Sequence, residues 1–340
     1  MRIVLADPPA FTPPYDHELA ASLARARCEV ELVTSHFRFG DAPRPDGYLR
    51  SEPYYPLSSR LFRRSRLRLP LKVLEHPFGV AALNRRRADV LHMQWLVPEL
   101  DERFLRPRIP SVFTAHDLLP RRTAKKQKLW SDLLARFDRI VVHSERGRDT
   151  LAALDIDAVV IPHPVFPSDP ERTDDGRTVL ALGVIRAYKG LGDAIEATRR
   201  AGARLLVAGD PLEPVDAYGG EHIEWRLGYL PDAEIDRALG DATVAVFPYR
   251  PELDQSGALL RALGAGVPAI AYDVGGIAEP VRRFGAGRVV APGDVDGLAE
   301  AITDVLRDPE PFRAGARRAR EELSWDAAAR AHLALYAEIA

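Results

Sequence analysis

The sequence is poor in the residues that crosslink a chain or build a sulfur-rich metal site. Its 340 residues include a single cysteine, Cys28, and two methionines. One cysteine excludes an internal disulfide and a cysteine-rich metal centre. Because Cys28 directly precedes the strand pattern EVELVT, we expect a packed thiol rather than a nucleophile.

Long apolar runs are also missing, and no segment approaches the roughly 18 apolar residues that a membrane-spanning helix needs. The N-terminal MRIVLADPP is typical of a strand and a turn rather than of a signal peptide, so we expect a cytoplasmic protein. The same strand runs into DPPAFTPP without a G-x-G-x-x-G turn, and the dinucleotide fingerprint of a dehydrogenase is therefore absent.

The net charge of −2 combines two halves of opposite sign. Residues 1–170 contain 27 Lys and Arg against 21 Asp and Glu, whereas the remainder contains 20 against 28. The basic excess is concentrated in RLFRRSRLRLPLK, residues 60–72, which has six basic residues and no acidic one. This asymmetry indicates an anionic surface or partner for the first half.

Short β-branched runs alternate with helical patterns, which predicts an α/β fold with parallel sheets. The Pro- and Asp-rich segment VFPSDPERTDDGR interrupts this alternation, which then restarts. We therefore expect two Rossmann-like, doubly wound domains facing across a cleft, the default ligand site. The expected strands are residues 2–7, 30–35, 89–95, 111–117, 139–144 and 158–164, then 178–184, 204–210, 223–230, 244–250, 268–274 and 288–292.

The expected domain boundaries follow from the same pattern. The N-terminal domain covers residues 1–165, and 166–177 form a linker. The C-terminal domain covers 178–324, and a helix at 325–340 crosses back to the first domain.

The segment GVIRAYKG, residues 183–190, places Arg186 and Lys189 at the end of an expected strand. Open α/β sheets bind ligands at that edge, so two cations there indicate an anionic ligand. A diphosphate would be held by the Arg fork and the Lys point charge. The alternative is a solvated loop that happens to be basic.

A second phosphate-binding pattern lies in PYRPELDQSGALLRALGAG, where Gln255, Ser256 and Gly257 lead into a helical pattern. The amides of Ser256, Gly257 and Ala258 would point out of a helix N-terminus, which binds phosphate. The alternative is an ordinary helix that Ser256 caps.

Together these motifs resemble the retaining GT-B glycosyltransferases of family 4, in the branch that contains QSG. The resemblance rests on the order and spacing of GVIRAYKG, LLVAGD, DQSGALLRALGAGVPAIAYDVGGIAE and APGDVDGLAEAI. TAHDLLP (114–120) and RIVVHSERGRDTL (139–151) extend it to the first half, so it covers most of the chain. It implies a retaining hexosyltransferase that uses a nucleotide sugar.

The resemblance also implies residue roles. Arg186 and Lys189 match the pair that grips the donor diphosphate, and Ser256 and Gly257 match the loop whose amides hold the distal phosphate. His116 matches a histidine near the transferred sugar, beside the alternative of a structural histidine. The donor site is completed by Gly183, Gln255 and Ala258.

One departure from the family pattern concerns two glutamates, which fall here on Leu253 and Arg261. Glu252 or Asp254 would then contact the sugar hydroxyls, and Arg261 occupies the place of the ribose-binding acid. The departure also fits a chain that has lost catalysis and kept binding.

The implied chemistry stabilises the departing diphosphate as negative charge develops on it. Arg186, Lys189 and the helix amides supply this stabilisation, and His116 completes the catalytic set. The resemblance implies retention of configuration with a phosphate oxygen as base. We expect no metal and no cofactor, because the UDP- or GDP-linked sugar is the donor substrate.

Residues 8–20, PPAFTPPYDHELA, lie where relatives carry an acceptor loop, here stiffened by prolines. Asp16, His17 and Asp117 are the candidate contacts to a glycan or lipid-linked acceptor. For the aspartates the alternative is capping of a helix or turn.

The basic segment 60–72 interleaves arginines with apolar residues, as does a segment that lies on an anionic bilayer. Peripheral attachment to the inner face of the membrane is therefore expected, beside the alternative of a solvated basic loop. A nucleic-acid partner is not expected, since few aromatics accompany the cations. The candidate membrane residues are Arg60, Phe62, Arg63, Arg64, Arg66 and Arg68.

Two other function classes stay open. A GT-B nucleotide-sugar 2-epimerase shares the two-domain architecture, but it needs several carboxylates around the sugar. A sugar-nucleotide or glycan-binding protein would bind without turnover.

Overall fold

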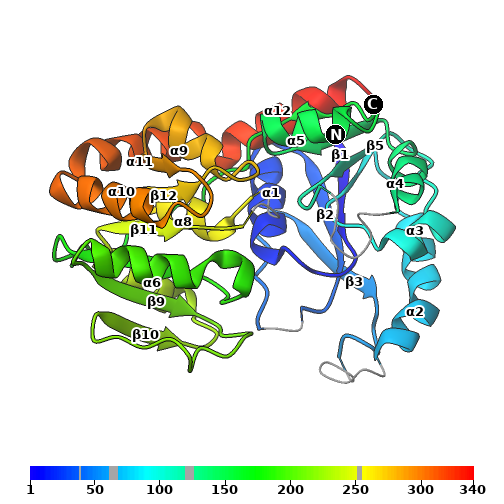
Figure 1. The fold of residues 1–340 in the computed structure, drawn as a ribbon. Helices are drawn as coiled ribbons and strands as arrows, with labels where there is room; N and C mark the ends of the chain where they lie inside the picture. Colours follow the sequence, from blue (N-terminus) through cyan, green and yellow to red (C-terminus); the bar gives the residue numbers. More distant parts are fainter. Residues whose placement is uncertain (38–39, 61–67, 119–125, 251–254) are drawn as a thin grey trace. The chain divides into compact units, whose positions relative to one another are not determined.

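The computed structural model describes residues 1–37, 40–60, 68–118, 126–250 and 255–340, which divide into two compact units. Unit 1 comprises Met1–Pro162 and Trp325–Ala340, and unit 2 comprises His163–Ser324. Each unit has one parallel sheet with helices packed on it, and an apolar core lies between the sheet and its helices (Figure 1). The predicted α/β class with two Rossmann-like sheets is confirmed.

The sheet of unit 1 has the strand order β3-β2-β1-β4-β5-β6-β7. Apolar runs such as RIVLAD are buried almost throughout, as expected for parallel strands covered by helices. The six strands predicted for the first half are present, and each begins within one residue of its expected start. The strands are β1 (Arg2–Asp7), β2 (Glu29–Ser35), β3 (Leu49–Tyr54), β4 (Val90–Met93), β5 (Ser111–Thr114), β6 (Arg139–Val142) and β7 (Val159–Val160).

Strand β3 was missed by the sequence analysis. Its residues, LRSEPY, are mostly polar and include Pro53, which cannot donate a backbone hydrogen bond. The strand lies at the edge of the sheet beside β2, where proline is tolerated. Its weak apolar pattern is that of an edge strand rather than of a loop.

The sheet of unit 2 has the order β10-β9-β8-β11-β12-β13, again with parallel pairing. All six strands predicted for this half are present with starts within one residue. They are β8 (Thr178–Leu182), β9 (Arg204–Gly209), β10 (Ile223–Leu227), β11 (Val244–Phe247), β12 (Ala269–Tyr272) and β13 (Gly287–Val290).

The helices follow the strands in alternation. Unit 1 has α1 (Pro13–Arg25), α2 (Arg68–Leu83), α3 (Pro98–Phe104), α4 (Gln127–Leu134), α5 (Glu145–Ala152) and α12 (Trp325–Ala337). Unit 2 has the short 3-10 helix η1 (Ala187–Lys189), α6 (Leu191–Arg200), α7 (Asp232–Asp241), α8 (Gly257–Gly264), α9 (Ala278–Phe284), α10 (Val295–Arg307) and α11 (Glu310–Glu322).

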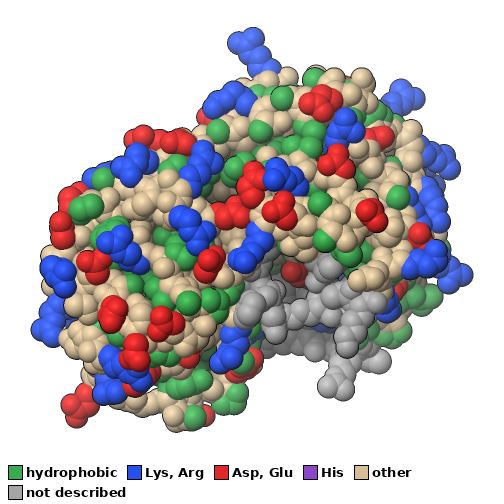
Figure 2. Space-filling view, turned by 45° about the horizontal axis from the view of Figure 1, so that its top comes forward, with side chains coloured by type: hydrophobic (Ala, Val, Ile, Leu, Met, Phe, Trp, Pro, Cys, Tyr) green, Lys and Arg blue, Asp and Glu red, His purple; other side chains and the backbone are tan. Residues whose placement is uncertain are grey.

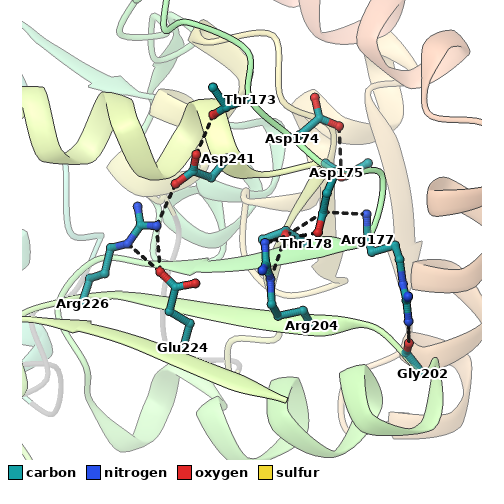
Figure 3. A network of polar contacts seen from close by, with 11 residues as sticks. Thr173, Asp174, Asp175, Arg177, Thr178, Gly202, Arg204, Glu224, Arg226 and Asp241 are labelled. Carbon is teal, nitrogen blue, oxygen red and sulfur yellow. Dashed lines mark hydrogen bonds and ion pairs between the residues drawn. The ribbon is translucent and has the colours of Figure 1, made fainter. Parts of the chain in front are cut away.

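The expected linker, residues 166–177, is held against unit 2 by polar contacts. Thr173 Oγ1 donates a hydrogen bond to Asp241 at 2.6 Å. Asp241 also pairs with Arg226, which pairs in turn with Glu224 (Figure 3). This network extends to the first residues of β8 and β9, and so lies at the edge of the sheet opposite to that where ligands bind in such folds.

Helix α12, at the end of the chain, belongs to unit 1 and packs against α1. The Tyr336 hydroxyl lies 2.6 Å from His92 Nδ1, and His92 Nε2 lies 2.7 Å from Thr114 Oγ1. Complete burial lowers the pKa of His92 well below its usual value. His92 is therefore a neutral residue of the core.

Candidate functional site

Two loops at the carboxyl edge of the unit 2 sheet lie against each other. One follows β8 and contains η1, and the other follows β11 and leads into α8. The Arg250 amide donates to the Tyr188 carbonyl at 2.7 Å, and the rings of Tyr188 and Tyr249 meet edge to face with centroids 6.1 Å apart. The structure thus brings together the two segments that the sequence analysis assigned to the donor.

Glycine at the end of the first loop permits this close approach. Gly190 has a positive φ of 66°. A Cβ added to Gly190 would lie 2.0 Å from the carbonyl oxygen of Pro248, at the end of β11. Any larger residue would therefore force the two loops apart.

Lys189 lies beside the start of α8. A Cβ built on Gly183 would lie 3.0 Å from Lys189 Nζ and 3.5 Å from Ala258 Cβ, so these three residues converge. Lys189 Nζ is 5.1 Å from the centre of the Tyr249 ring, and a cavity of about 30 Å³ lies beside it. The lysine charge and the α8 dipole have the same sign at this point, so together they favour an anion.

Arg186 precedes η1 and is exposed. Within the described part of the chain, its side chain makes no hydrogen bond or ion pair. Its guanidinium therefore needs to break no described contact in order to reach an anion near Lys189.

Ser256 occupies the N-cap of α8, as the capping alternative supposes. Its Oγ accepts from the Leu259 amide at 3.3 Å and donates to the Tyr249 hydroxyl at 3.2 Å. Among the described residues, nothing accepts from the amides of Gly257 and Ala258. Gly257 is exposed, and of the described residues a Cβ added there would meet Phe166 alone, at 4.0 Å. Capping by Ser256 therefore leaves the amides of Gly257 and Ala258 available to bind a ligand.

Of the four remaining donor candidates, the structure describes Gln255 and Arg261. Glu252 and Asp254 lie outside the described residues. Gln255 is half-buried directly before the Ser256 cap. Arg261 pairs with Asp232 at 3.0 Å and lies over the Phe166 ring, so a ribose contact would compete with that ion pair.

In unit 1, His116 lies just after β5 within a cluster of rings. Its Nε2 is 3.0 Å from Gln94 Oε1, and its Nδ1 is 3.2 Å from His143 Nε2. Trp95 stacks on the ring at a centroid distance of 5.5 Å, and Tyr15 meets it edge-on at 4.5 Å. His116 was predicted from the sequence, whereas these four neighbours were not. One of them, His143, could have been predicted from the sequence. It follows β6 just as His116 follows the neighbouring strand β5.

Asp16 is buried rather than placed on the surface, with 1% of its area exposed. It forms a carboxyl pair with Asp7, whose Oδ2 accepts from the amides of Phe11 and Thr12 at 2.7 and 3.1 Å. Burial raises the pKa of Asp7 to about 6 and that of Asp16 well above its usual value. The N-cap of α1 is Thr12, so Asp16 is not the expected cap.

The other two acceptor candidates are partly accessible. His17, in the first half of α1, has its Nδ1 3.0 Å from the hydroxyl of Tyr48, which precedes β3. Asp117 is half-buried beside His116.

Four of the candidate membrane residues, Phe62, Arg63, Arg64 and Arg66, lie outside the described residues. Arg60 is exposed and pairs with Glu52 at 3.2 Å, and Arg68 begins α2. Helix α2, beside β3 in Figure 1, leaves large apolar side chains exposed to solvent. They are Leu69, Val73, Leu74 and Phe78, the last with 76% of its area exposed.

The structure also bears on metal, thiol, nucleic-acid and membrane-spanning alternatives. No group of three or more His, Cys, Asp or Glu side chains in the described residues is arranged to hold a metal ion. Partial burial raises the pKa of the Cys28 thiol, which disfavours the nucleophilic thiolate. On the face drawn in Figure 2, the Lys and Arg side chains of the described residues are interspersed with those of Asp and Glu. None of the helices in the described ranges is long and apolar enough to span a bilayer.

Comparison with protein families gives matches in both halves. Residues 15–169 match the model described as glycosyltransferase family 4, and residues 176–308 match that described as glycosyl transferases group 1. A glycogen synthase of Mycobacterium tuberculosis is 34% identical over 160 residues, which are 44% of this chain. The match spans 38% of that relative, well under half of its length.

Solved structures show the same fold. Sucrose-phosphate synthase from Thermosynechococcus elongatus superposes with a TM-score of 0.75 at 19% identity, covering 99% of this chain and 98% of that one. Anabaena HepE in complex with UDP and glucose gives a TM-score of 0.68 at 16% identity, covering 99% of this chain and 100% of its own. These likenesses establish the GT-B fold.

Proposed function

We propose that this chain, a glycosyltransferase family 4-like protein with the GT-B fold, transfers a sugar from a nucleoside diphosphate to a glycan or lipid-linked acceptor, with retention of configuration. The observation that carries the proposal is the convergence of Lys189, Gly183 and Ala258 at the N-terminus of α8. The two cations and the amides of Gly257 and Ala258 are suited to the phosphate oxygens of a diphosphate.

In the proposed reaction, the glycosidic bond to the diphosphate breaks and its electron pair leaves with the phosphate. Lys189 and Arg186 neutralise that charge as it develops, and the helix amides bind the phosphate oxygens. Because Lys189 and the start of α8 already converge, these groups can stabilise the transition state with little reorganisation, and Arg186 joins them when the anion binds. The acceptor hydroxyl enters from the face that the diphosphate leaves, and a phosphate oxygen takes its proton. This set of charges is sufficient without a metal ion or an additional cofactor.

His116 is proposed to contact the transferred sugar, and Asp16, His17 and Asp117 to belong to the acceptor region. Since Asp16 is buried and paired with Asp7, its part is to shape the loop before α1 rather than to touch a sugar directly. HepE, which shares the fold, is in complex with UDP and glucose, and UDP is therefore the first donor nucleotide to test, with GDP second.

The test is calorimetric titration of UDP and GDP into the wild type and the double variant Arg186→Ala/Lys189→Ala. Each charge-assisted hydrogen bond contributes about 1.5–3 kcal/mol, so we expect affinity to fall at least about 100-fold. Arg199→Ala/Arg200→Ala removes two exposed cations from α6 in the same unit and should leave affinity unchanged. Unaltered binding in the first variant would show that the diphosphate binds elsewhere.

A measurement of turnover distinguishes an enzyme that transfers the sugar from a protein that only binds the nucleotide sugar. Release of nucleoside diphosphate from a UDP- or GDP-sugar is measured with candidate glycan acceptors, and the anomeric configuration of the product is read by NMR. Binding without release or product would favour the non-catalytic alternative, and inversion would contradict the proposed mechanism.

We further propose that α2 attaches the protein to an anionic bilayer. The exposed side chains of Leu69, Val73, Leu74 and Phe78 would enter the interface between head groups and acyl chains. The basic sequence 60–72, which precedes and begins the helix, supplies the complementary charge. A lipid-linked acceptor would be presented at such a surface.

A further inference from the structure

A chain of hydrogen bonds in unit 1 passes through both nitrogens of two histidines. His143 Nδ1 lies 2.9 Å from the Ile161 carbonyl oxygen, and His143 Nε2 lies 3.2 Å from His116 Nδ1. His116 Nε2 lies 3.0 Å from the side-chain amide of Gln94. His143 and Gln94 are buried, with 4% and 0% of their area exposed. Solvent is thus largely excluded from these two residues, whereas His116 between them is half-buried.

The Ile161 end fixes the direction of the chain. A carbonyl oxygen only accepts hydrogen bonds, so His143 Nδ1 must carry a hydrogen and donate it. A neutral imidazole has a single N–H, and His143 Nε2 is then left with a lone pair. That lone pair points at His116 Nδ1, which must donate in turn. The tautomer of His116 is therefore set by a backbone carbonyl two hydrogen bonds away.

The Gln94 side chain can form a hydrogen bond with His116 Nε2 whether or not that nitrogen carries a hydrogen. With His116 Nδ1 protonated, its Nε2 is the basic nitrogen and faces the Gln94 side chain. An amide can present its NH₂ group to a neutral Nε2 or, after rotation by half a turn, its oxygen to a protonated one. With the oxygen toward His116, Gln94 Nε2 is buried without an acceptor. Rotation of the amide places a donor on the neutral Nε2.

The rings around His116 fix its orientation. Trp95 stacks on one face with an interplanar angle of 17°, and Tyr15 meets the ring edge-on. Tyr15 also contacts His143, at a centroid distance of 5.5 Å. Rotation of His116 that would exchange its two nitrogens is opposed by these contacts as well as by both hydrogen bonds.

We propose that His143 and Gln94 are positioning residues that hold His116 in the Nδ1–H tautomer, with Nε2 as its basic nitrogen. The catalytic role of this tautomer rests on the proposed function. In that reaction, a sugar hydroxyl displaces the Gln94 amide and donates a hydrogen bond to His116 Nε2. His143 touches no substrate and acts only through His116. The tautomer itself is a property of the free protein and does not depend on any reaction.

The first test is spectroscopic. Long-range ¹H–¹⁵N correlation of protein labelled with ¹⁵N-histidine at pH 8 distinguishes a protonated ring nitrogen from one with a lone pair, and His116→Gln assigns the signal among the nine histidines. In the wild type we expect His116 with a protonated Nδ1 and an unprotonated Nε2. A wild-type His116 protonated at Nε2 overturns the proposal, and this measurement needs no variant of His143.

The second test uses two substitutions of His143. His143→Phe keeps a ring but removes the acceptor, so the His116 signal should move toward the Nε2–H tautomer. His143→Gln offers a carbonyl to the same nitrogen and should restore the Nδ1–H form. An unchanged His116 signal in His143→Phe, or no recovery in His143→Gln, contradicts the positioning role.

A third measurement connects the tautomer to transfer. If the proposed reaction is observed, His143→Phe should lower kcat at least about tenfold, because Nε2 of His116 is then no longer its basic nitrogen. Nucleotide affinity should stay within about twofold, because the residues of the diphosphate site are unchanged. An unchanged kcat would show that the contact between His143 and His116 does not contribute to catalysis. Absence of any transfer in the wild type would refute the proposed function and leave the NMR result standing.

Discussion

Lys189 Nζ lies 5.1 Å from the centre of the Tyr249 ring, and the hydroxyl of that ring receives a hydrogen bond from Ser256 at 3.2 Å. Tyr249 therefore joins the cation of the loop after β8 to the cap of α8. Two groups from different segments meet on one buried side chain, which has 2% of its area exposed. Substitutions of Tyr249 can separate the role of the ring from that of the hydroxyl.

Tyr249→Phe keeps the ring under Lys189, and we expect its affinity for UDP or GDP to stay within about threefold of the wild type. Tyr249→Leu removes the ring, and the loss of a cation–π contact worth about 1 kcal/mol should weaken binding about fivefold. Calorimetric titration measures both. If Tyr249→Phe weakens binding as much as Tyr249→Leu, the hydroxyl rather than the ring supports the site.

Ser256→Asp separates capping from phosphate binding. Aspartate is a good N-cap and its charge is favourable at a helix N-terminus, so the melting temperature should be unchanged or higher. The same charge repels a phosphate at the amides of Gly257 and Ala258, and nucleotide affinity should fall at least about tenfold. Retained affinity would place the phosphate away from α8.

A matched control exists at another cap of unit 2. Asp294 caps α10 by accepting from the Gly297 amide at 2.9 Å, and it lies on a different helix from the candidate site. Asp294→Ala should lower the free energy of unfolding by about 1 kcal/mol without changing nucleotide affinity. Thermal unfolding and titration of both variants therefore distinguish a stability effect from a binding effect.

Most of the fold could be predicted from the sequence because parallel strands buried on both faces are continuous apolar runs, as in RIVLAD of β1. Strand β3 escaped because LRSEPY carries charges and Pro53 at a sheet edge. The pairing of segments around Lys189 and Ser256 was foreseeable, since loops after parallel strands leave the sheet at one edge.

The candidate site of unit 1 was less predictable, for a different reason. The sequence suggests a capping or surface role for Asp16, but the first turn of α1 buries its side chain against Asp7. The bonds from His116 to Gln94 and His143 depend on side-chain rotamers of residues on three neighbouring strands and loops. Sequence periodicity specifies which face a residue occupies, but not which nitrogen meets which oxygen.

The carboxyl pair of Asp7 and Asp16 should make stability depend on pH. Folding raises the pKa of Asp7 from its usual value to about 6, so the folded state binds the proton more tightly. The stabilising contribution is complete below pH about 4 and is lost as the pH rises through about 6. The free energy of unfolding of the wild type, relative to that of Asp16→Asn, should therefore fall over this interval.

Denaturant unfolding at several pH values between 4 and 8 measures this difference. Asn is neutral throughout, so the variant keeps the ionisation of Asp7 but lacks that of Asp16, whose pKa burial raises well above its usual value. The variant should therefore gain stability relative to the wild type as the pH rises. Asp41→Asn, which removes an exposed carboxyl of the same unit, should show no such trend. A constant difference between wild type and Asp16→Asn would mean that the pair does not share a proton.

The exposed face of α2 predicts binding to anionic vesicles. We expect co-sedimentation with phosphatidylglycerol vesicles and little with phosphatidylcholine, because the apolar side chains and the basic sequence act together. Leu74→Ser/Phe78→Ser should reduce the bound fraction at least about tenfold, since full burial of each side chain contributes about 1.5–3 kcal/mol. Leu212→Ser/Tyr229→Ser, which changes two exposed apolar residues of unit 2, should bind as the wild type does. Equal sedimentation with both lipids, or an equal loss in the control, would exclude α2 as the attachment surface.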